Sequence, residues 1–374
     1  MPPFTFPARL QGFRVHLVGA KGTGVCALAE LLVRWGARVS GSDVSDRFYT
    51  DTILAELGIS IREFSADAID DSIDLVVFSA AYNPQTHPEL IRANELGIPI
   101  ASYPEALGAF SRTIDSSGIC GVHGKTTTTA LAGVIAKALD LPATVLAGSA
   151  VSSFGDRSTM YNGDRFFIAE TCEYRRHFLQ FSPGRILLTS VESDHQDYYP
   201  DYNSILQAFV EYMGVLPQGG YIIYCADDAG AKEALGLIRR TRTDLRIIPY
   251  GFSAEGAFRI QDYSTGEERA QFHLALSHEA FSIRVPGRHI ALDATGALAL
   301  CSTMMPAAGA GEQFTVAQLA SVRTALEDFR GSRRRSEILG EARGVLFMDD
   351  YAHHPGAIRT TLAGLREFYP GRRL

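Results

Sequence analysis

Short apolar runs alternate with longer stretches that carry apolar side chains at helical spacing over the first hundred residues. Residues 74–79 (DLVVFS) are almost continuously apolar, which is typical of a strand buried on both faces of a sheet. This alternation of strand and helix predicts a parallel, doubly wound sheet. The strands are expected at residues 13–18, 37–43, 74–79 and 98–100, and the helices at residues 25–35 and 88–96.

A second series of the same kind begins near Arg112. Within it, residues 258–285 alternate polar and apolar positions, which favours antiparallel strands with one solvated face. Residues 307–311 are rich in glycine and alanine and predict a surface loop. The other strands are expected at residues 113–120, 166–169, 186–189, 221–225 and 246–250, and the helices at residues 127–139 and 291–304.

A third segment follows residue 326, where a basic turn at residues 333–335 precedes a strand at 345–348 and a helix at 355–368. A chain of 374 residues is long enough for two or three domains. The pattern therefore predicts an α/β protein in three parts. We expect a Rossmann-like domain at residues 1–111, a central α/β domain of the P-loop ATPase type at 112–325, and the start of a third, Rossmann-like domain at 326–374.

Composition narrows the functional classes. A net charge of −7 argues against non-specific binding of nucleic acid. The five cysteines are scattered and odd in number, which fits a reducing cytoplasm better than a disulfide framework or a structural zinc site. The N-terminus does not resemble a signal peptide, and no apolar run is long enough to span a bilayer. We expect a cytoplasmic protein without membrane insertion; its oligomeric state cannot be predicted.

The motif GVHGKT at residues 121–126 stands between a predicted strand and a predicted helix. Glycines allow backbone N–H groups to surround a phosphate at the start of a helix, and a lysine and a hydroxyl can bind the phosphates and Mg²⁺. Lys125 and Thr126 suit those roles. The longer P-loop pattern is not met, because Ile119 stands where it requires glycine. The bland alternative is an ordinary capped helix whose lysine is solvated.

Two polar segments follow later predicted strands. Glu170 comes directly after the strand at 166–169, and His195 lies between Asp194 and Asp197 after the strand at 186–189. Parallel sheets place their chemistry at the carboxyl ends of strands, so both side chains are candidate ligands for a divalent ion near the phosphate loop. Taken alone, Glu170 is better explained as an ordinary glutamate at the end of a strand, and His195 as a polar side chain of a surface loop.

Around these residues the chain resembles the Mur ligases, the ATP-dependent amide-forming enzymes of peptidoglycan synthesis. The histidine in GVHGKT is similar to that of the branch that joins L-alanine to UDP-N-acetylmuramate. Further matching motifs occur in order along the chain, at residues 19–24 (GAKGTG), 41–43 (GSD), 170–174 (ETCEY), 194–197 (DHQD), 285–289 (VPGRH), 329–335 (FRGSRRR) and 349–355 (DDYAHHP).

The resemblance implies a bacterial, cytoplasmic ligase that uses ATP and Mg²⁺ and acts on UDP-N-acetylmuramate and L-alanine through an acyl phosphate. The catalytic groups it implies are Lys125, Glu170, His195 and His353. The magnesium ligands it implies are Thr126, Glu170 and His195.

The binding residues follow from the same resemblance. Those expected to bind ATP are Gly121, His123, Gly124, Lys125, Thr126, Thr127, Asp293, Arg334 and Asp350. Those expected to bind the UDP-sugar are Gly19, Gly22, Thr23, Gly24, Asp43 and Ser79. Tyr351 and His353 are expected to place the amino acid.

The chain departs from the family pattern in two respects. Relatives usually carry asparagine at the positions of Ile290 and Asp293, so the asparagine contacts to adenine are not carried over. The chain also ends at Leu374, inside what we expect to be a larger third domain, so that most of the region expected to select the amino acid is absent.

Other interpretations remain open. A nicotinamide dehydrogenase would use Gly19–Gly24 and Asp43, although the order is GxxGxG rather than GxGxxG. A P-loop kinase or GTPase would use Lys125 and Thr126 but would leave the first domain unexplained. A sister ligase that attaches a preformed peptide to the same sugar nucleotide shares the phosphate loop. A non-enzymatic nucleotide-binding or regulatory protein is the fourth alternative.

Overall fold

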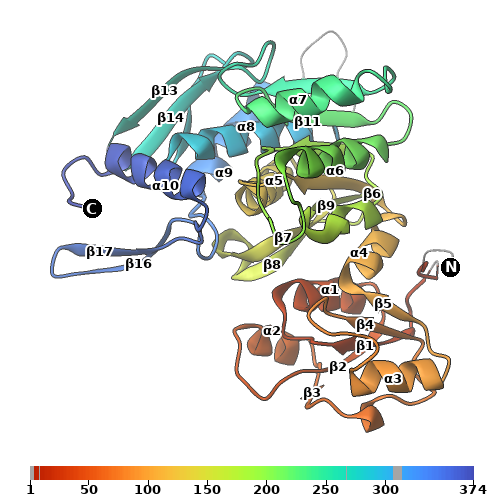
Figure 1. Ribbon diagram of the computed structural model, residues 1–374. Helices are drawn as coiled ribbons and strands as arrows, with labels where there is room; N and C mark the ends of the chain where they lie inside the picture. The colour runs from red at the N-terminus through yellow and green to blue at the C-terminus, as the bar shows by residue number, and fades with distance from the viewer. Residues whose placement is uncertain (1–3, 8, 267, 306–313) are drawn as a thin grey trace. The chain divides into compact units, whose positions relative to one another are not determined.

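The structure is a computed structural model that describes residues 4–7, 9–266, 268–305 and 314–374 (Figure 1). Its contacts separate it into two compact units. The first holds the chain up to residue 113 together with residues 157–159, and the second holds residues 114–156 and 160–374. The predicted loop at 307–311 lies outside the described residues. The division into three domains at residues 111 and 325 stays a prediction.

An open parallel sheet in the order β3-β2-β1-β4-β5 forms the centre of the first unit. Val15 of β1 lies between Val39 of β2 and Leu75 of β4, so the strand order reverses direction at β1. In sheets of this kind such a reversal opens a crevice at the carboxyl ends of the strands. The strands are β1 (Arg14–Val18), β2 (Arg38–Ser42), β3 (Ile61–Arg62), β4 (Leu75–Phe78) and β5 (Ile100–Ser102).

Helices cover both faces of this sheet (Figure 1). On one face, Leu90 and Ala93 pack with Val18 and Val76 in a buried cluster. The other face is covered by α1, which contacts α2 and α4. The helices are α1 (Thr23–Arg34), α2 (Thr50–Glu56), α3 (Pro88–Glu95) and α4 (Tyr103–Ser111), with a short 3₁₀ turn η1 (Ala66–Ala68).

Apart from the first three residues of β8, the second unit contains a sheet in the order β12-β11-β10-β6-β9-β7-β8. Leu187 of β10 lies between Ile119 of β6 and Ile223 of β11, and all three are fully buried. Since β6 stands in the middle of the sheet, the loop after it emerges at the centre of the carboxyl edge. The strands are β6 (Asp115–Cys120), β7 (Ala143–Val151), β8 (Arg157–Tyr161), β9 (Phe166–Glu170), β10 (Arg185–Leu188), β11 (Tyr221–Cys225) and β12 (Arg246–Tyr250).

Two groups of helices enclose this sheet (Figure 1). One group joins α5 to α8 and α9, and the other joins α6 to α7. Leu131 and Ile135 of α5 and Leu298 of α8 belong to the main buried cluster. The helices are α5 (Lys125–Ala138), α6 (Tyr202–Gly214), α7 (Ala229–Ile238), α8 (Arg288–Ser302) and α9 (Val316–Asp328), with 3₁₀ turns η2 (Ser152–Phe154) and η3 (Tyr174–Gln180).

The C-terminal segment is anchored to the second unit by its last helix, α10 (Pro355–Phe368). Phe368 and Tyr369 are buried in the main cluster. Ahead of this helix, β16 (Glu337–Ala342) and β17 (Val345–Asp349) form an antiparallel hairpin, separate from the antiparallel sheet of β13 (Ile260–Gly266), β14 (Arg269–Leu274) and β15 (Phe281–Ile283). The hairpin and α10 expose several large apolar side chains, namely Ile338, Leu339, Val345, Phe347, Ile358 and Leu362.

Most predicted elements are present, and the differences have local causes. Helix α8 starts at Arg288, three residues before the predicted start, because Gly287 adopts a φ of +111° and caps it. The last strand of the first unit begins at Ile100 rather than Ile98. The helices and strands that were not predicted are α2, α4, α6, α7, α9, β3, β7, β8 and β16.

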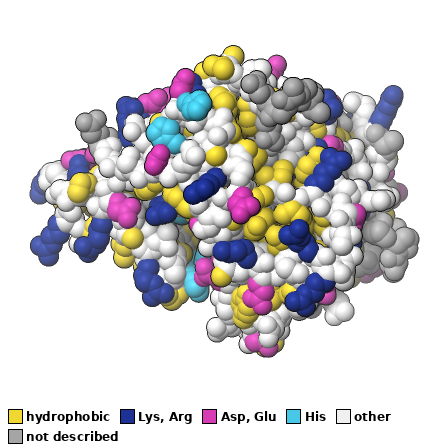
Figure 2. Space-filling model, turned by 90° about the horizontal axis from the view of Figure 1, so that it is seen from above, with side chains coloured by type: hydrophobic (Ala, Val, Ile, Leu, Met, Phe, Trp, Pro, Cys, Tyr) yellow, Lys and Arg dark blue, Asp and Glu magenta, His cyan; other side chains and the backbone are white. Residues whose placement is uncertain are grey.

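Acidic and basic side chains are interspersed on the face shown in Figure 2, with hydrophobic side chains exposed between them. Within the described part of the chain, every helix is too short or too polar to span a bilayer.

Candidate functional site

The phosphate-type loop connects β6 to α5 at the centre of the second unit. Gly121 has a φ of +135° and Gly124 a φ of +80°, conformations that other residues rarely adopt. A Cβ on Gly121 would lie 2.0 Å from Thr189 Oγ1, so the loop also needs glycine for close packing. Helix α5 then begins at Lys125, which points the free N–H groups of its first turn at the loop.

Lys125 lies at the centre of this loop, with its side chain largely buried. Its Nζ donates to the carbonyl of Gly121 at 2.6 Å and to Glu173 Oε1 at 2.9 Å. Burial is the largest single influence and lowers the pKa of Lys125, but the surrounding acidic groups, Glu173 first among them, together raise it above its usual value. Lys125 therefore remains protonated at neutral pH and supplies a positive charge at the phosphate loop.

Glu173 is the central acid of the site, and sequence reasoning did not assign it a role. Its side chain is 1% exposed, and its Oε2 has no hydrogen-bond partner within the described chain. Burial raises the pKa of Glu173, but Lys125 and His195 lower it by more, so the carboxylate is ionised at neutral pH. The acid-rich motif ETCEY contained this residue, but only the fold shows that Glu173, rather than Glu170, pairs with the lysine.

His195 contacts the same carboxylate from the loop after β10. Its Nε2 lies 3.4 Å from Glu173 Oε1, and this interaction raises the pKa of His195. The residue adopts a φ of +54°, and Arg175 and Arg176 next to Glu173 adopt similar values of +50° and +59°. Non-glycine residues in this region concentrate at functional sites, because the surrounding structure must compensate for their strain.

Glu170 is the last residue of β9, one position inside the strand it was predicted to follow, and its side chain turns toward β7. Its Oε2 accepts a 2.8 Å hydrogen bond from the backbone N–H of Gly148. A Cβ on Gly148 would lie 2.4 Å from that oxygen, so only glycine leaves room for the carboxylate. Glu170 is close enough to Lys125 to raise the pKa of the lysine, although it makes no direct ion pair with it.

Asp293 approaches the phosphate loop from α8. Its Oδ1 accepts a 3.0 Å hydrogen bond from Thr128, and a Cβ on Gly124 would lie 2.7 Å from the same oxygen. Its Oδ2 is buried without a partner in the described chain. Burial raises the pKa of Asp293 to about 8, so that the group is largely a neutral carboxylic acid at pH 7. Ile290, the other departing position, is buried in the core.

The C-terminal segment reaches the loop through Arg335. Its Nη2 donates to Thr126 Oγ1 at 3.4 Å, and its guanidinium lies 5.0 Å from the ring of Tyr351. Arg334, which was predicted to bind ATP, also lies over the ring of Tyr351, with its guanidinium 5.1 Å from the ring centre. Sequence reasoning placed Arg335 in the basic turn but gave it no role.

Two further predicted residues in this segment hold its own backbone. Asp350 accepts hydrogen bonds from the N–H groups of Ser336 and Ala352, at 2.7 and 2.8 Å. His353 Nδ1 lies 3.0 Å from the carbonyl of Tyr351. Tyr351 and His353, which were predicted to place the amino acid, thus belong to a local turn. In the described structure His353 makes no direct contact with Lys125 or Glu173.

Three more predicted positions surround the loop. Thr126 and Thr127 lie in the first turn of α5 and are 3% and 7% exposed. His123 is held by its backbone N–H, which donates to Ser190 Oγ at 2.9 Å. Burial lowers the pKa of His123, so that its imidazole is neutral at pH 7.

The predicted UDP-sugar residues gather at the carboxyl edge of the first unit. Gly19 follows β1 with a φ of +80°, and Thr23 and Gly24 open α1. A Cβ on Gly19 would lie 2.6 Å from the ring of Tyr82 and 3.0 Å from the Cβ of Ser79. The glycine loop and Ser79 therefore lie side by side at the carboxyl ends of β1 and β4.

Asp43 orders the backbone at this edge of the sheet through its carboxylate. Its two carboxylate oxygens accept hydrogen bonds from the N–H groups of Lys21 and Val44, both at 2.7 Å. The carboxylate is 5% exposed and orders the loop beside Gly22. Any contact it makes with a ligand would add to this role.

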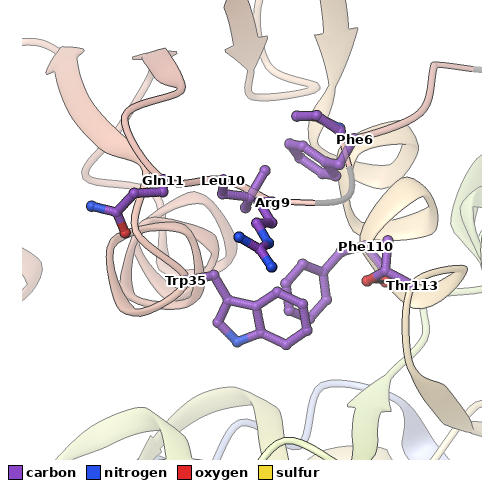
Figure 3. A pocket seen from close by; sticks show the side chains of 8 residues that line it. Phe6, Arg9, Leu10, Gln11, Trp35, Phe110 and Thr113 are labelled. Carbon is purple, nitrogen blue, oxygen red and sulfur yellow. Dashed lines mark hydrogen bonds between the residues drawn. The ribbon is translucent and has the colours of Figure 1, made fainter.

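A separate cavity of ≈ 510 Å³ lies near the N-terminus of the first unit (Figure 3). Phe6, Leu10, Trp35 and Phe110 give it a largely apolar wall, with Arg9 at its side. None of the predicted site residues lines it, so it is not the candidate nucleotide site.

The residues around the loop fit a nucleoside triphosphate and Mg²⁺. Glu170, Glu173 and the hydroxyl of Thr126 are oxygen donors of the kind that Mg²⁺ prefers. A buried ionised carboxylate with an unpartnered oxygen, next to a buried lysine, is a polar environment that a charged ligand can complete. The fold and this site define a P-loop-type α/β enzyme that binds nucleoside triphosphates.

Comparison with known proteins gives the family. The chain matches the sequence profiles described as "Mur ligase family, catalytic domain" at residues 14–114, "Mur ligase middle domain" at 119–301 and "Mur ligase, glutamate ligase domain" at 334–374. The chain belongs to the Mur ligase family, a family of ATP-dependent amide-bond-forming enzymes.

Several proteins similar to this chain share one name. The UDP-N-acetylmuramate–L-alanine ligase of Treponema pallidum (strain Nichols) is 51% identical over 99% of this chain and 77% of its own length. The ligase of the same name from Borreliella burgdorferi is 39% identical over 96% of this chain and 76% of its own. The crystal structure of UDP-N-acetylmuramate-alanine ligase from Thermotoga maritima is 26% identical, with a TM-score of 0.76, covering 96% of this chain and 78% of that one.

A related enzyme has the same fold. The crystal structure of a murein peptide ligase from Psychrobacter arcticus is 22% identical to this chain, with a TM-score of 0.74. The aligned region covers 97% of this chain and 78% of the murein peptide ligase chain. Identity at this level supports the fold and leaves the choice of acceptor open.

Proposed function

We propose that this protein joins L-alanine to UDP-N-acetylmuramate with ATP, as the names of its relatives state for them. The observation that carries the proposal is the buried arrangement of Lys125, Glu173 and His195 at the glycine loop, together with 51% identity to a ligase of that name. In this reaction the muramate carboxylate attacks the γ-phosphorus of ATP and ADP leaves. The amine of L-alanine then attacks the acyl carbon, and phosphate leaves.

The phosphate loop suits the first step. The N–H groups of Gly121 to Thr126 and the ammonium of Lys125 can surround the phosphates and offset the charge that moves to ADP. To do so, Lys125 must turn from the Gly121 carbonyl toward the nucleotide. Bound Mg²⁺ would neutralise phosphate charge, and Thr126, Glu170 and His195 are the residues that would hold it.

Glu173 has a positioning role in this proposal. It touches both Lys125 and His195, and it holds one against the loop and the other at the rim of the site. Asp293 and Arg335 are further candidates for nucleotide contact, because each lies against the loop and Asp293 has an unpartnered oxygen. Tyr351 and His353 remain the candidates for placing the amino acid.

The first unit supplies a second anion site. The N-terminus of α1 at Gly22-Thr23-Gly24 can receive the diphosphate of the UDP-sugar. The substrates are small and soluble, which fits a cytoplasmic protein.

A phosphate-release assay on the purified chain tests the proposal. We expect release only when ATP, Mg²⁺, UDP-N-acetylmuramate and L-alanine are all present, with L-alanyl product confirmed by mass spectrometry. Release without the sugar nucleotide would overturn the ligase assignment in favour of a phosphotransferase. Product formed from a preformed peptide but not from L-alanine would favour the murein peptide ligase reaction. Lys125→Ala should abolish release while preserving binding of the UDP-sugar.

A further inference from the structure

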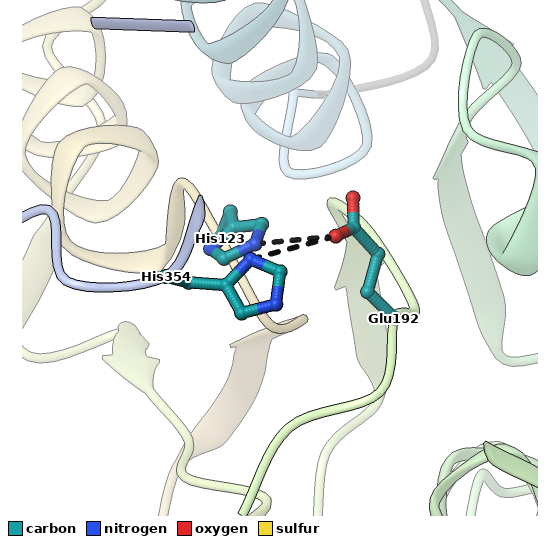
Figure 4. A group of neighbouring side chains, drawn as sticks. All are labelled: His123, Glu192 and His354. Carbon is teal, nitrogen blue, oxygen red and sulfur yellow. Dashed lines mark ion pairs between the residues drawn. The ribbon is translucent and has the colours of Figure 1, made fainter. Parts of the chain in front are cut away.

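Three side chains from distant segments meet beside the phosphate loop. His123 belongs to the loop, Glu192 follows β10, and His354 caps the N-terminus of α10 (Figure 4). His123 Nε2 lies 3.5 Å from Glu192 Oε2, and His354 Nδ1 lies 4.0 Å from the same oxygen. One donor atom from each residue lies within 4.8 Å of the others.

The cluster is incompletely satisfied by the protein alone. His123 Nε2 is buried and makes no hydrogen bond within the described chain. The two imidazole rings are 5.3 Å apart and tilted by 39°, so they do not stack. Buried polar atoms are normally paired, so an unpaired ring nitrogen that points at a carboxylate indicates a missing partner between them.

We propose that His123, Glu192 and His354 form a binding site for a transition-metal cation of the zinc type. Two imidazoles and a carboxylate are a donor set typical of Zn²⁺, whereas Mg²⁺ sites are built mainly from oxygen donors and do not favour two imidazoles. Bonds of about 2.0–2.1 Å place the ligands of a tetrahedral ion about 3.3 Å apart. The two separations from Glu192 Oε2, 3.5 and 4.0 Å, need a contraction of less than 1 Å to reach that value. The donor atoms of the two histidines lie within 4.8 Å of each other, so the rings must also move closer together when an ion binds.

This site is distinct from the candidate magnesium site, which uses Thr126, Glu170 and His195. The carboxylate of Glu192 is 43% exposed and the histidines 30% and 29%, so an ion can enter from solvent. His354 Nδ1 also accepts a 3.3 Å hydrogen bond from the N–H of Gly356, a long bond that the metal would displace.

The ion would connect the C-terminal segment to the phosphate loop. His354 directly follows His353 in the sequence and lies three residues after Tyr351. A bond between the metal and His354 would therefore restrain the turn that is proposed to place the amino acid. Three protein ligands leave one position of a tetrahedral ion for water or another small ligand. The expected consequence is a chain that is more resistant to heat and to cleavage near α10 when the metal is bound.

Cobalt provides a direct test, because Co²⁺ replaces Zn²⁺ and absorbs visible light intensely in tetrahedral sites. The full chain is titrated with Co²⁺ in excess Mg²⁺, and then Zn²⁺ is added in competition. We expect one tetrahedral Co²⁺ per chain, displaced by Zn²⁺. Glu192→Gln and His354→Asn should each weaken binding by roughly tenfold or more. Asparagine is chosen at 354 because it preserves the helix cap.

Two controls make the test specific. His278→Asn removes an exposed histidine outside the cluster and should leave Co²⁺ affinity unchanged. His195→Asn should also leave it unchanged; if it removes the absorption while His354→Asn retains it, the ion binds at the ATP site and the proposal fails. Absence of tetrahedral absorption in the parent chain would show that the cluster is an ion pair only. None of these results depends on the ligase activity.

Discussion

At the scale of single residues, the site depends on one buried carboxylate. Glu173 faces both Lys125 and His195 and is 1% exposed, so it is the buried counter-charge of Lys125. Removing one partner of a buried ion pair leaves the other charge uncompensated, which costs more than the pair itself contributes.

Glu173→Gln should therefore destabilise the chain by about 3–5 kcal/mol in urea unfolding. The loss should be smaller with Mg²⁺ and ATP, because the phosphates supply a new counter-charge for Lys125. Glu211→Gln is the matched control, since Glu211 pairs with Arg176 at the surface and is 52% exposed. Equal losses in the two variants would show that Glu173 is not the buried hub described here.

The carboxyl of Asp293 makes a pH prediction. Its pKa is about 8 in the folded chain and near 3.8 when unfolded, so the folded state retains a proton that the unfolded state releases. The stability that this proton supplies is complete below about pH 4 and is lost as the pH rises toward 8, by up to about 1.4 kcal/mol per pH unit.

Asp293→Asn should remove that loss. We expect the variant to be more stable than the parent at pH 8 and close to it at pH 4, measured by urea unfolding at both values. If the difference in unfolding free energy between Asp293→Asn and the parent is the same at pH 4 and pH 8, Asp293 does not bind a proton in the folded chain and the prediction is wrong.

At the scale of elements, α10 is held by a close helix contact. A Cβ on Gly364 would lie 2.6 Å from the Cα of Gly287, which caps α8 with a φ of +111°. Since backbone atoms cannot move aside as flexible side chains do, this glycine allows Phe368 to reach the core.

Gly364→Ala should destabilise the chain by about 1–3 kcal/mol through overpacking. Gly236→Ala is the control, because Gly236 also lies inside a helix but has no atom within 4 Å of a Cβ position. That change should stabilise α7 by about 0.5–1 kcal/mol. Thermal unfolding compares the two, and stabilisation by both substitutions would contradict the close contact.

At the scale of the whole molecule, each unit is built around a sheet of its own, and an anion site is proposed in each. ATP is proposed to bind the second unit and the UDP-sugar the first. Hydrogen exchange should therefore show protection of residues 19–24 with the UDP-sugar and of residues 121–126 with Mg²⁺ and ATP. Protection of both loops by ATP alone would contradict this assignment.

The sequence by itself determined the local features. Gly121 and Gly124, followed by a lysine and a hydroxyl between a predicted strand and a predicted helix, indicated a phosphate loop, although the longer pattern was not met and the other motifs along the chain were needed to interpret it. The parallel sheets followed from apolar runs that alternate with helical spacing. β7 was missed because residues 143–151 (ATVLAGSAV) mix apolar residues with glycine and serine and have no clear period.

Only the tertiary structure decided how distant residues combine. Glu170 and Glu173 are only three residues apart in the sequence. The packing of β9 against β7 turns Glu170 toward Gly148 and leaves Glu173 facing Lys125. The burial that raises the pKa of Asp293 comes from α5 and α8 packing together, which no local pattern encodes. The meeting of His123, Glu192 and His354 likewise depends on three separate chain segments. Local physical chemistry specifies the elements, and long-range packing decides which side chains share an environment.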